Sequence, residues 1–73
     1  MVERSIRLNY PPTLIHKPII SQLIRHFDLT VNITGAQISS EHGWIDILIS
    51  GDEAIVNQAI NWLKTEGMKV KTK

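Results

Sequence analysis

Hydrophobic and polar residues alternate along the start of the chain, over residues 2–10. One side of this alternation carries Val2, Ile6, Leu8 and Tyr10, and the other carries Glu3, Ser5, Arg7 and Asn9. Because successive side chains of a β-strand point to opposite faces, the pattern predicts a strand with one buried face. Pro11 and Pro12 cannot donate to a sheet, so the strand is expected to end before them.

The alternation returns in residues 29–39 and changes phase partway along. Val31 and Ile33 share one face, whereas Ile38 has the opposite parity. Gly35 lies between them, and one extra residue in a strand shifts the parity of everything that follows. The pattern therefore predicts a strand with a bulge or bend near Gly35.

Residues 39–43 are typical of a hairpin loop, and residues 44–50 form the next predicted strand. One face of this strand carries Ile45, Ile47 and Ile49, and the other carries Trp44, Asp46, Leu48 and Ser50. A strand that is apolar on one face and half-apolar on the other is typical of the centre of a sheet. Residues 68–73 alternate apolar residues with lysines, which predicts a short strand at an edge.

Residues 13–28 have the spacing of an amphipathic helix instead. Their apolar arc consists of Ile19, Ile20, Leu23, Ile24 and Phe27. Thr13 is the predicted N-cap, and Pro18 must then lie in or near the first turn, where a missing N–H costs little.

Residues 51–67 predict a second helix with a wide apolar stripe. The stripe consists of Ile55, Val56, Ala59, Ile60, Trp62 and Leu63. Asp52 is the expected cap, Glu53 favours the first turn, and Gly67 is expected just after the helix end. Trp62, at the edge of the stripe, is interpreted as a partly buried core residue.

The order of elements is βαββαβ, which predicts an α+β, ferredoxin-like domain over residues 1–73. It would contain a four-stranded antiparallel sheet with two helices on one face. The opposite face would then have no helix to cover it. That open face is expected to carry Thr30, Asn32 and Thr34 with Arg7, Asn9, Trp44, Asp46 and Leu48. The residues of this face near Asn32 are uncharged and able to form hydrogen bonds, although an exposed face could carry charged residues instead.

Composition narrows the possible functions. The chain has 73 residues and a net charge of +1, which argues against a protein that follows nucleic-acid phosphates. It has no cysteine, which removes disulfides, thiolate metal sites and thiol catalysis and fits a cytoplasmic location. No apolar run approaches the roughly 20 residues of a membrane span. We therefore expect no nucleic-acid partner and no membrane insertion.

Candidate chemistry is sparse. His16, His26 and His42 are too far apart in sequence to form a helical metal-ligand pair, so no metal site and no cofactor are predicted. Asp46 is the one acid expected in the middle of a strand, and pairing with Arg7 on a neighbouring strand is the favoured interpretation. No nucleophile–base pair is recognisable, so we do not expect an enzyme.

Other functions of ferredoxin-like domains leave signatures that are missing here. The sheet lacks the paired aromatic residues of an RNA-recognition surface, and the chain lacks a CxxC motif and an arginine-bearing phosphate loop. Trp44 and Leu48 on the open face, with Arg7 and Asn9, instead predict a dimer or partner interface. Alternatively, Trp44 and Leu48 pack beneath a tail or loop.

Three pieces of the chain, in this order and spacing, resemble the NIL domain family. They are "HKPIISQLIRHFDLTVNIT", "GWIDILISG" and "AINWLKTEGMKV", which together span nearly the whole chain. The third letter of the motif that names the family is Thr34 here, a departure. The resemblance implies a ferredoxin-like fold similar to ACT domains. Family members occur on the ATPase subunits of methionine importers, fused to ferredoxin domains, and alone.

The resemblance implies a non-catalytic regulatory domain that binds an amino acid, methionine or a related sulfur compound, as a homodimer. Asn32 matches the asparagine of the motif and is the first candidate for ligand contact, because its amide both donates and accepts. The expected site comprises Asn32, Ile33, Thr34 and Gly35. A neutral face of this kind can hold a zwitterion without burying an unpaired charge.

Two other functions remain open. The chain could be a protein-interaction module that serves a transporter or a ferredoxin-type partner without binding a ligand. It could also be an accessory of sulfur or iron–sulfur metabolism. Ligand-induced stabilisation would separate the ligand-binding hypothesis from the interaction module, and a bound partner that carries an iron–sulfur cluster would favour the third.

Overall fold

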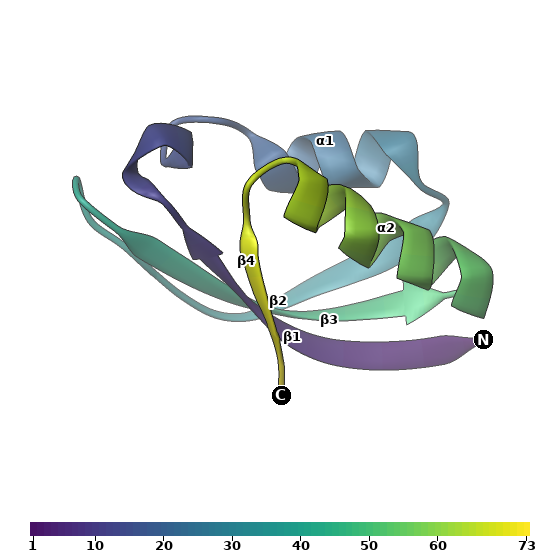
Figure 1. Ribbon diagram of the computed structural model, residues 1–73. Helices are drawn as coiled ribbons and strands as arrows, with labels where there is room; N and C mark the ends of the chain where they lie inside the picture. The colour runs from purple at the N-terminus through teal and green to yellow at the C-terminus, as the bar shows by residue number, and fades with distance from the viewer.

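The computed structural model describes residues 1–73 and has the predicted βαββαβ order (Figure 1). The strands are β1 (Val2–Tyr10), β2 (Leu29–Ile38), β3 (Gly43–Gly51) and β4 (Lys69–Thr72). The helices are the short 3₁₀ helix η1 (Pro12–Leu14), α1 (Ile19–His26) and α2 (Glu53–Thr65). All strand pairs are antiparallel, in the order β2-β3-β1-β4, and both α-helices lie on one side of the sheet. The α+β, ferredoxin-like prediction is confirmed.

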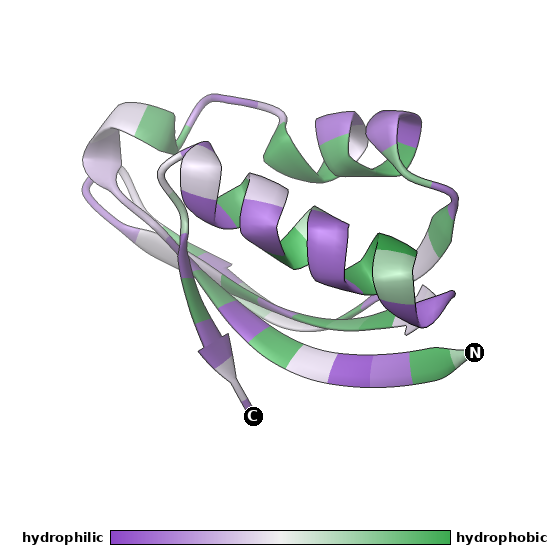
Figure 2. Ribbon diagram, turned by 45° about the vertical axis from the view of Figure 1, so that its right-hand side comes forward, coloured by the Kyte–Doolittle hydropathy of each residue, from purple (hydrophilic) through white to green (hydrophobic).

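The two central strands, β1 and β3, carry the core. They pair along their whole length, with Ile6 opposite Ile47 and Leu8 opposite Ile45. Because opposite residues share a face, these side chains form one apolar layer beneath the helices. Figure 2 shows hydrophobic residues alternating with polar ones along the strands. The buried core consists of Ile6, Leu8, Tyr10, Ile19, Leu23, Ile45, Ile47, Ile49, Val56, Ala59, Leu63 and Met68.

The first helix begins later than the sequence pattern predicted. Pro12–Leu14 forms η1, and α1 starts only at Ile19, so Thr13 is not its N-cap. Pro18 precedes the helix with φ −79° and ψ 66°, outside the helical region. A helix starting near residue 13 would have to pass through Pro18, which lacks an N–H and disfavours a helical residue before it. The resulting helix has only eight residues.

The predicted bulge in the second strand is confirmed. The β2–β3 register shifts between Ile33 and Gly35, which leaves Thr34 as the additional residue. Ile33 lies opposite Ile47 before the bulge, and Ile38 lies opposite Gly43 after it. The bulge therefore returns Ile38 to the helix side of the sheet despite its opposite parity.

The second half of the chain follows the prediction closely. Strand β3 is central and β4 is an edge strand. Asp52 occupies the N-cap position of α2, although its side chain makes no capping hydrogen bond. Gly67 follows the helix with φ +101°, a conformation that favours glycine. No helix of the structure is both long enough and apolar enough to cross a membrane.

Candidate functional site

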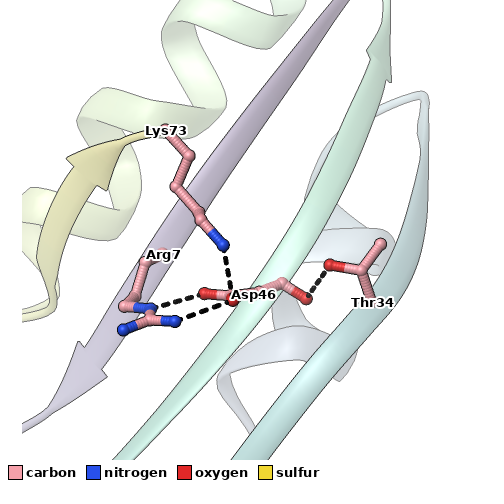
Figure 3. A network of polar contacts seen from close by, with 4 residues as sticks. All are labelled: Arg7, Thr34, Asp46 and Lys73. Carbon is pink, nitrogen blue, oxygen red and sulfur yellow. Dashed lines mark hydrogen bonds and ion pairs between the residues drawn. The ribbon is translucent and has the colours of Figure 1, made fainter.

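The open face of the sheet is organised around one acid. Asp46 on β3 lies directly opposite Arg7 on β1. Arg7 Nε donates to Asp46 Oδ1 at 2.7 Å, and Nη2 donates to Oδ2 at 3.0 Å (Figure 3). This two-point geometry is the strong form of an arginine–carboxylate pair. The predicted pairing of Asp46 with Arg7 is confirmed.

A second cation completes the network around the same carboxylate. Lys73 Nζ donates to Asp46 Oδ2 at 2.8 Å, and Thr34 Oγ1 donates to the backbone carbonyl of Asp46 at 3.3 Å (Figure 3). The hydrogen bonds from Arg7 and then Lys73 hold the pKa of Asp46 well below its usual range. The same bond to Asp46 raises the pKa of Arg7. Asp46 therefore stays ionised at neutral pH, and its tightly held carboxylate is poorly suited to accept a proton from a substrate.

The ring of Trp44 contacts Arg7, the cation that binds Asp46. The Arg7 guanidinium lies over the indole, with Cζ at 4.2 Å from the ring centroid, within the range of a cation–π contact. Asn9 lies opposite Trp44 in the β1–β3 ladder. The structure thus brings together three of the four predicted interface residues, and the fourth, Leu48, lies further along β3. All four are half-buried.

The predicted ligand residues lie on the edge strand β2, which pairs with β3 on one side only. Asn32 is exposed and sits opposite Leu48 on the open face, whereas Ile33 points to the helix side. Thr34 is the bulge residue, and Gly35 lies close to the Trp44 ring. Asn32 and Ile33 therefore point to opposite faces of one strand. Within a single copy, these four residues line an edge of the sheet and do not enclose a pocket.

Two shallow cavities lie elsewhere. One, of about 290 Å³, is lined by Met1, Asp28, Leu29, Thr30, Ser50, Gly51, Asp52 and Ile55. The other, of about 280 Å³, is lined by Asn9, Tyr10, Pro11, Pro12, His42, Gly43, Trp44 and Lys69. The first reaches Thr30, two residues from Asn32, but neither includes any residue from 32 to 35. No group of three or more metal-binding side chains lies together.

Sequence patterns missed an exposed apolar surface around β2. Ile33 and Ile38 point to the helix side of this strand, yet 53% and 52% of each remains exposed. Ile24 on α1, predicted in the buried arc of the helix, is 49% exposed. The short α1 leaves the part of β2 that carries Ile33 and Ile38 uncovered, and only the late start of that helix could have signalled this. By contrast, Trp62 is partly buried as predicted and contacts His26 and Phe27.

Comparison with known proteins finds one matching family and relatives of one kind. The NIL domain family matches residues 4–72. A methionine import ATP-binding protein of Bacillus licheniformis is 31% identical over 72 residues, covering 93% of this chain and 21% of that protein. One from Paraburkholderia xenovorans is 31% identical over 70 residues, covering 90% of this chain and 20% of that protein. The chain thus spans about a fifth of the length of these relatives.

The fold also has a solved counterpart. The crystal structure of the C-terminal domain of an ABC transporter ATP-binding protein from Enterococcus faecalis superposes with a TM-score of 0.83. It is 22% identical, and the match covers 94% of this chain and 81% of that one. At this identity the likeness concerns the fold, and the family assignment depends on the sequence matches.

Proposed function

The chain belongs to the NIL domain family, and from this premise we propose that it is a non-catalytic regulatory domain that binds an amino acid as a homodimer. The observation that carries this proposal is the position of Asn32. It is exposed, neutral and one residue from Ile33, where the register begins to shift, on an edge strand that pairs with β3 on one side and is open on the other. A bulge leaves backbone N–H and C=O groups outside the regular ladder, where a zwitterion can use them.

Methionine or a related sulfur amino acid is the ligand that fits this setting best. The relatives are named as methionine import proteins. The Asn32 amide offers both donors and an acceptor to the charged end of an amino acid. Leu48, directly opposite Asn32, offers an apolar contact to a thioether side chain. The neutral composition of this strand avoids trapping an unpaired charge beside the ligand.

A second copy would complete such a site. Strand β2 has a neighbour on one side only, its Ile33 and Ile38 leave apolar surface exposed, and Ile24 on α1 is half-exposed as well. Two β2 strands that paired around a two-fold axis near their middle would bring both Asn32 regions together and cover these isoleucines. The site would then be enclosed by two protomers, which accounts for its openness in one.

The test is thermal unfolding with and without about millimolar methionine, compared with other amino acids. A ligand that binds only the folded state adds about 2.7 kcal/mol of stability at a concentration 100 times its Kd. We expect a rise in Tm of the unmodified protein and no rise for Asn32→Ala. Asn57→Ala, at an exposed position on α2, is the matched control and should keep the response.

The alternative is a protein-interaction module that serves a transporter or a ferredoxin-type partner without a ligand. It is favoured by the absence of residues 32 to 35 from both cavities. If no amino acid changes the Tm at millimolar concentration, the ligand-binding proposal is wrong and this alternative takes its place. If methionine stabilises Asn32→Ala as well as the unmodified protein, the binding site lies elsewhere.

A further inference from the structure

The edge of the sheet formed by β4 differs in charge from the edge formed by β2. Strand β4 has β1 as its only neighbour, and its other side is open (Figure 1). Lys73 N–H donates to Ser5 C=O at 2.9 Å, which identifies these opposite residues as a hydrogen-bonded pair. Such pairs alternate in an antiparallel ladder, so Lys71 and Lys69 also direct their backbone groups to β1. Val70 and Thr72 therefore direct their N–H and C=O groups outward.

The side chains of β4 add positive charge along the same edge. Lys69 and Lys71 lie opposite Asn9 and Arg7, so they share the open face with Arg7. Both lysines are exposed, and neither takes part in any of the three ion pairs of the structure. Asp46, the acid at the centre of this face, is already bound by Arg7 and Lys73. In a chain of net charge +1, this edge thus concentrates unpaired cations.

We propose that the free edge of β4 binds an extended acidic segment of a partner protein as an additional strand. Backbone groups of Val70 and Thr72 would pair with the segment, a common mode of peptide recognition. Acidic side chains at every second position would lie opposite Lys69 and Lys71 on the open face. The alternate side chains would be apolar and would lie near the half-buried Val70, which packs against the core.

The charge pattern selects this occupant against two others. Pairing of β4 with the β4 of a second copy would place lysines beside lysines, which is unfavourable. The neutral β2 is therefore the edge for self-association, and β4 is the edge for a different chain. A single-stranded nucleic acid would use its phosphates on the lysines. It would leave the outward backbone groups of Val70 and Thr72 without partners, whereas a protein strand satisfies both.

The probe is a fluorescent peptide that alternates glutamate and valine, titrated with the full chain at low salt. We expect saturable binding, and the double substitution Lys69→Glu with Lys71→Glu should weaken it by about tenfold or more, because two attractions become repulsions. Arg25→Glu with Lys64→Glu changes the net charge equally at exposed helical positions and is the control. Its affinity should stay within about twofold of the unmodified protein.

Thr72→Pro tests the strand geometry separately from charge. Proline removes the outward N–H of residue 72 and leaves the N–H groups of Lys71 and Lys73 in place for β1. We expect peptide binding to be lost while thermal unfolding shows that the domain remains folded. In the unmodified protein, the peptide should also shift the amide resonances of Val70 and Thr72 in NMR spectra.

Four results would overturn the proposal. The first is no binding of the peptide at millimolar concentration. The second is peptide affinity that is unchanged by the lysine reversals, and the third is amide resonances of Val70 and Thr72 that do not move. The fourth is an oligothymidine of equal charge that binds as tightly as the peptide, which would make the edge a general polyanion surface. These results are independent of the methionine test, since β4 and Asn32 lie on opposite edges of the sheet.

Discussion

The indole ring of Trp44 lies against the backbone of Gly35. A Cβ atom at residue 35 would stand 3.5 Å from Trp44 Cζ3 and 3.9 Å from Asp46 Oδ2. These are ordinary van der Waals distances, and Gly35 does not have a positive φ. The position therefore has room for a methyl group and no backbone conformation that requires glycine. Larger side chains would displace the ring, and with it the Arg7 guanidinium above it.

Gly35→Ala is accordingly expected to stabilise the protein. The substitution reduces the conformational entropy of the unfolded chain and adds a methyl group in van der Waals contact with Trp44. The free energy of unfolding should therefore rise by about 0.4–1 kcal/mol. Gly67→Ala is the contrasting variant, because φ there is +101° and a Cβ would approach Leu14 Cδ1 at 3.2 Å. It should lose about 1–2 kcal/mol. Urea unfolding measures both, and a destabilised Gly35→Ala would contradict this account.

Two neighbouring residues of α1 should respond very differently to truncation. Leu23 is completely buried, whereas Ile24 is 49% exposed. Leu23→Ala leaves a cavity in the core and should lower the free energy of unfolding by about 2–5 kcal/mol. Ile24→Ala should cost less than about 1 kcal/mol at protein concentrations that keep the chain monomeric, because much of its side chain then contacts water. Similar losses for both would mean that α1 is rotated from the orientation described.

Sequence periodicity was enough to predict the fold because the alternation of apolar residues in the strands differs clearly from their helical spacing in α1 and α2. Ile45, Ile47 and Ile49 can form a single face only in a strand, and the change of parity at Ile38 required the bulge that the structure has. The predicted start of α1 was wrong because Thr13 was taken as the N-cap, although the apolar arc begins only at Ile19, after Pro18. The steric restriction before a proline is local, and it outweighed the pattern.

The candidate site was only partly predictable. Arg7 and Asp46 could be paired because both lie in the middle of strands that a βαββαβ fold makes neighbours. The third member, Lys73, belongs to the predicted strand 68–73, but its alternation with apolar residues does not indicate which lysine reaches Asp46. Exposure of Ile33 depends on how far a helix reaches over the edge strand. That reach is a tertiary property, and alternation along β2 cannot report it.

Ile33→Glu tests the proposed self-association through β2. A glutamate on both copies would set two like charges at the shared edge and bury them without partners. We expect the variant to sediment as a monomer at concentrations where the unmodified protein is a dimer. Ala54→Glu adds the same charge at an exposed position on α2 and should leave the dimer intact. Equal sedimentation of all three proteins would exclude β2 as the dimer edge.

Asp46→Asn should change how stability depends on pH, and the direction follows from its pKa. In the unfolded chain the carboxyl titrates near the ordinary value of about 3.9. In the folded protein Arg7 and Lys73 hold its pKa lower, so the unfolded state takes up a proton first as the solution is acidified. The stability contributed by this carboxylate is therefore complete above that ordinary value and is lost progressively below about pH 4.

The amide variant lacks this contribution at every pH and leaves Arg7 and Lys73 beside each other without an anion. Its Tm should be lower than that of the unmodified protein at neutral pH, and the difference should shrink on acidification. Thermal unfolding followed by circular dichroism from neutral pH to acid measures this convergence. Asp28→Asn, which removes an exposed acid that forms no ion pair, is the control. Its Tm should vary with pH in the same way as that of the unmodified protein. A constant difference between Asp46→Asn and the unmodified protein at all pH values would show that Asp46 acts through packing and not through its charge.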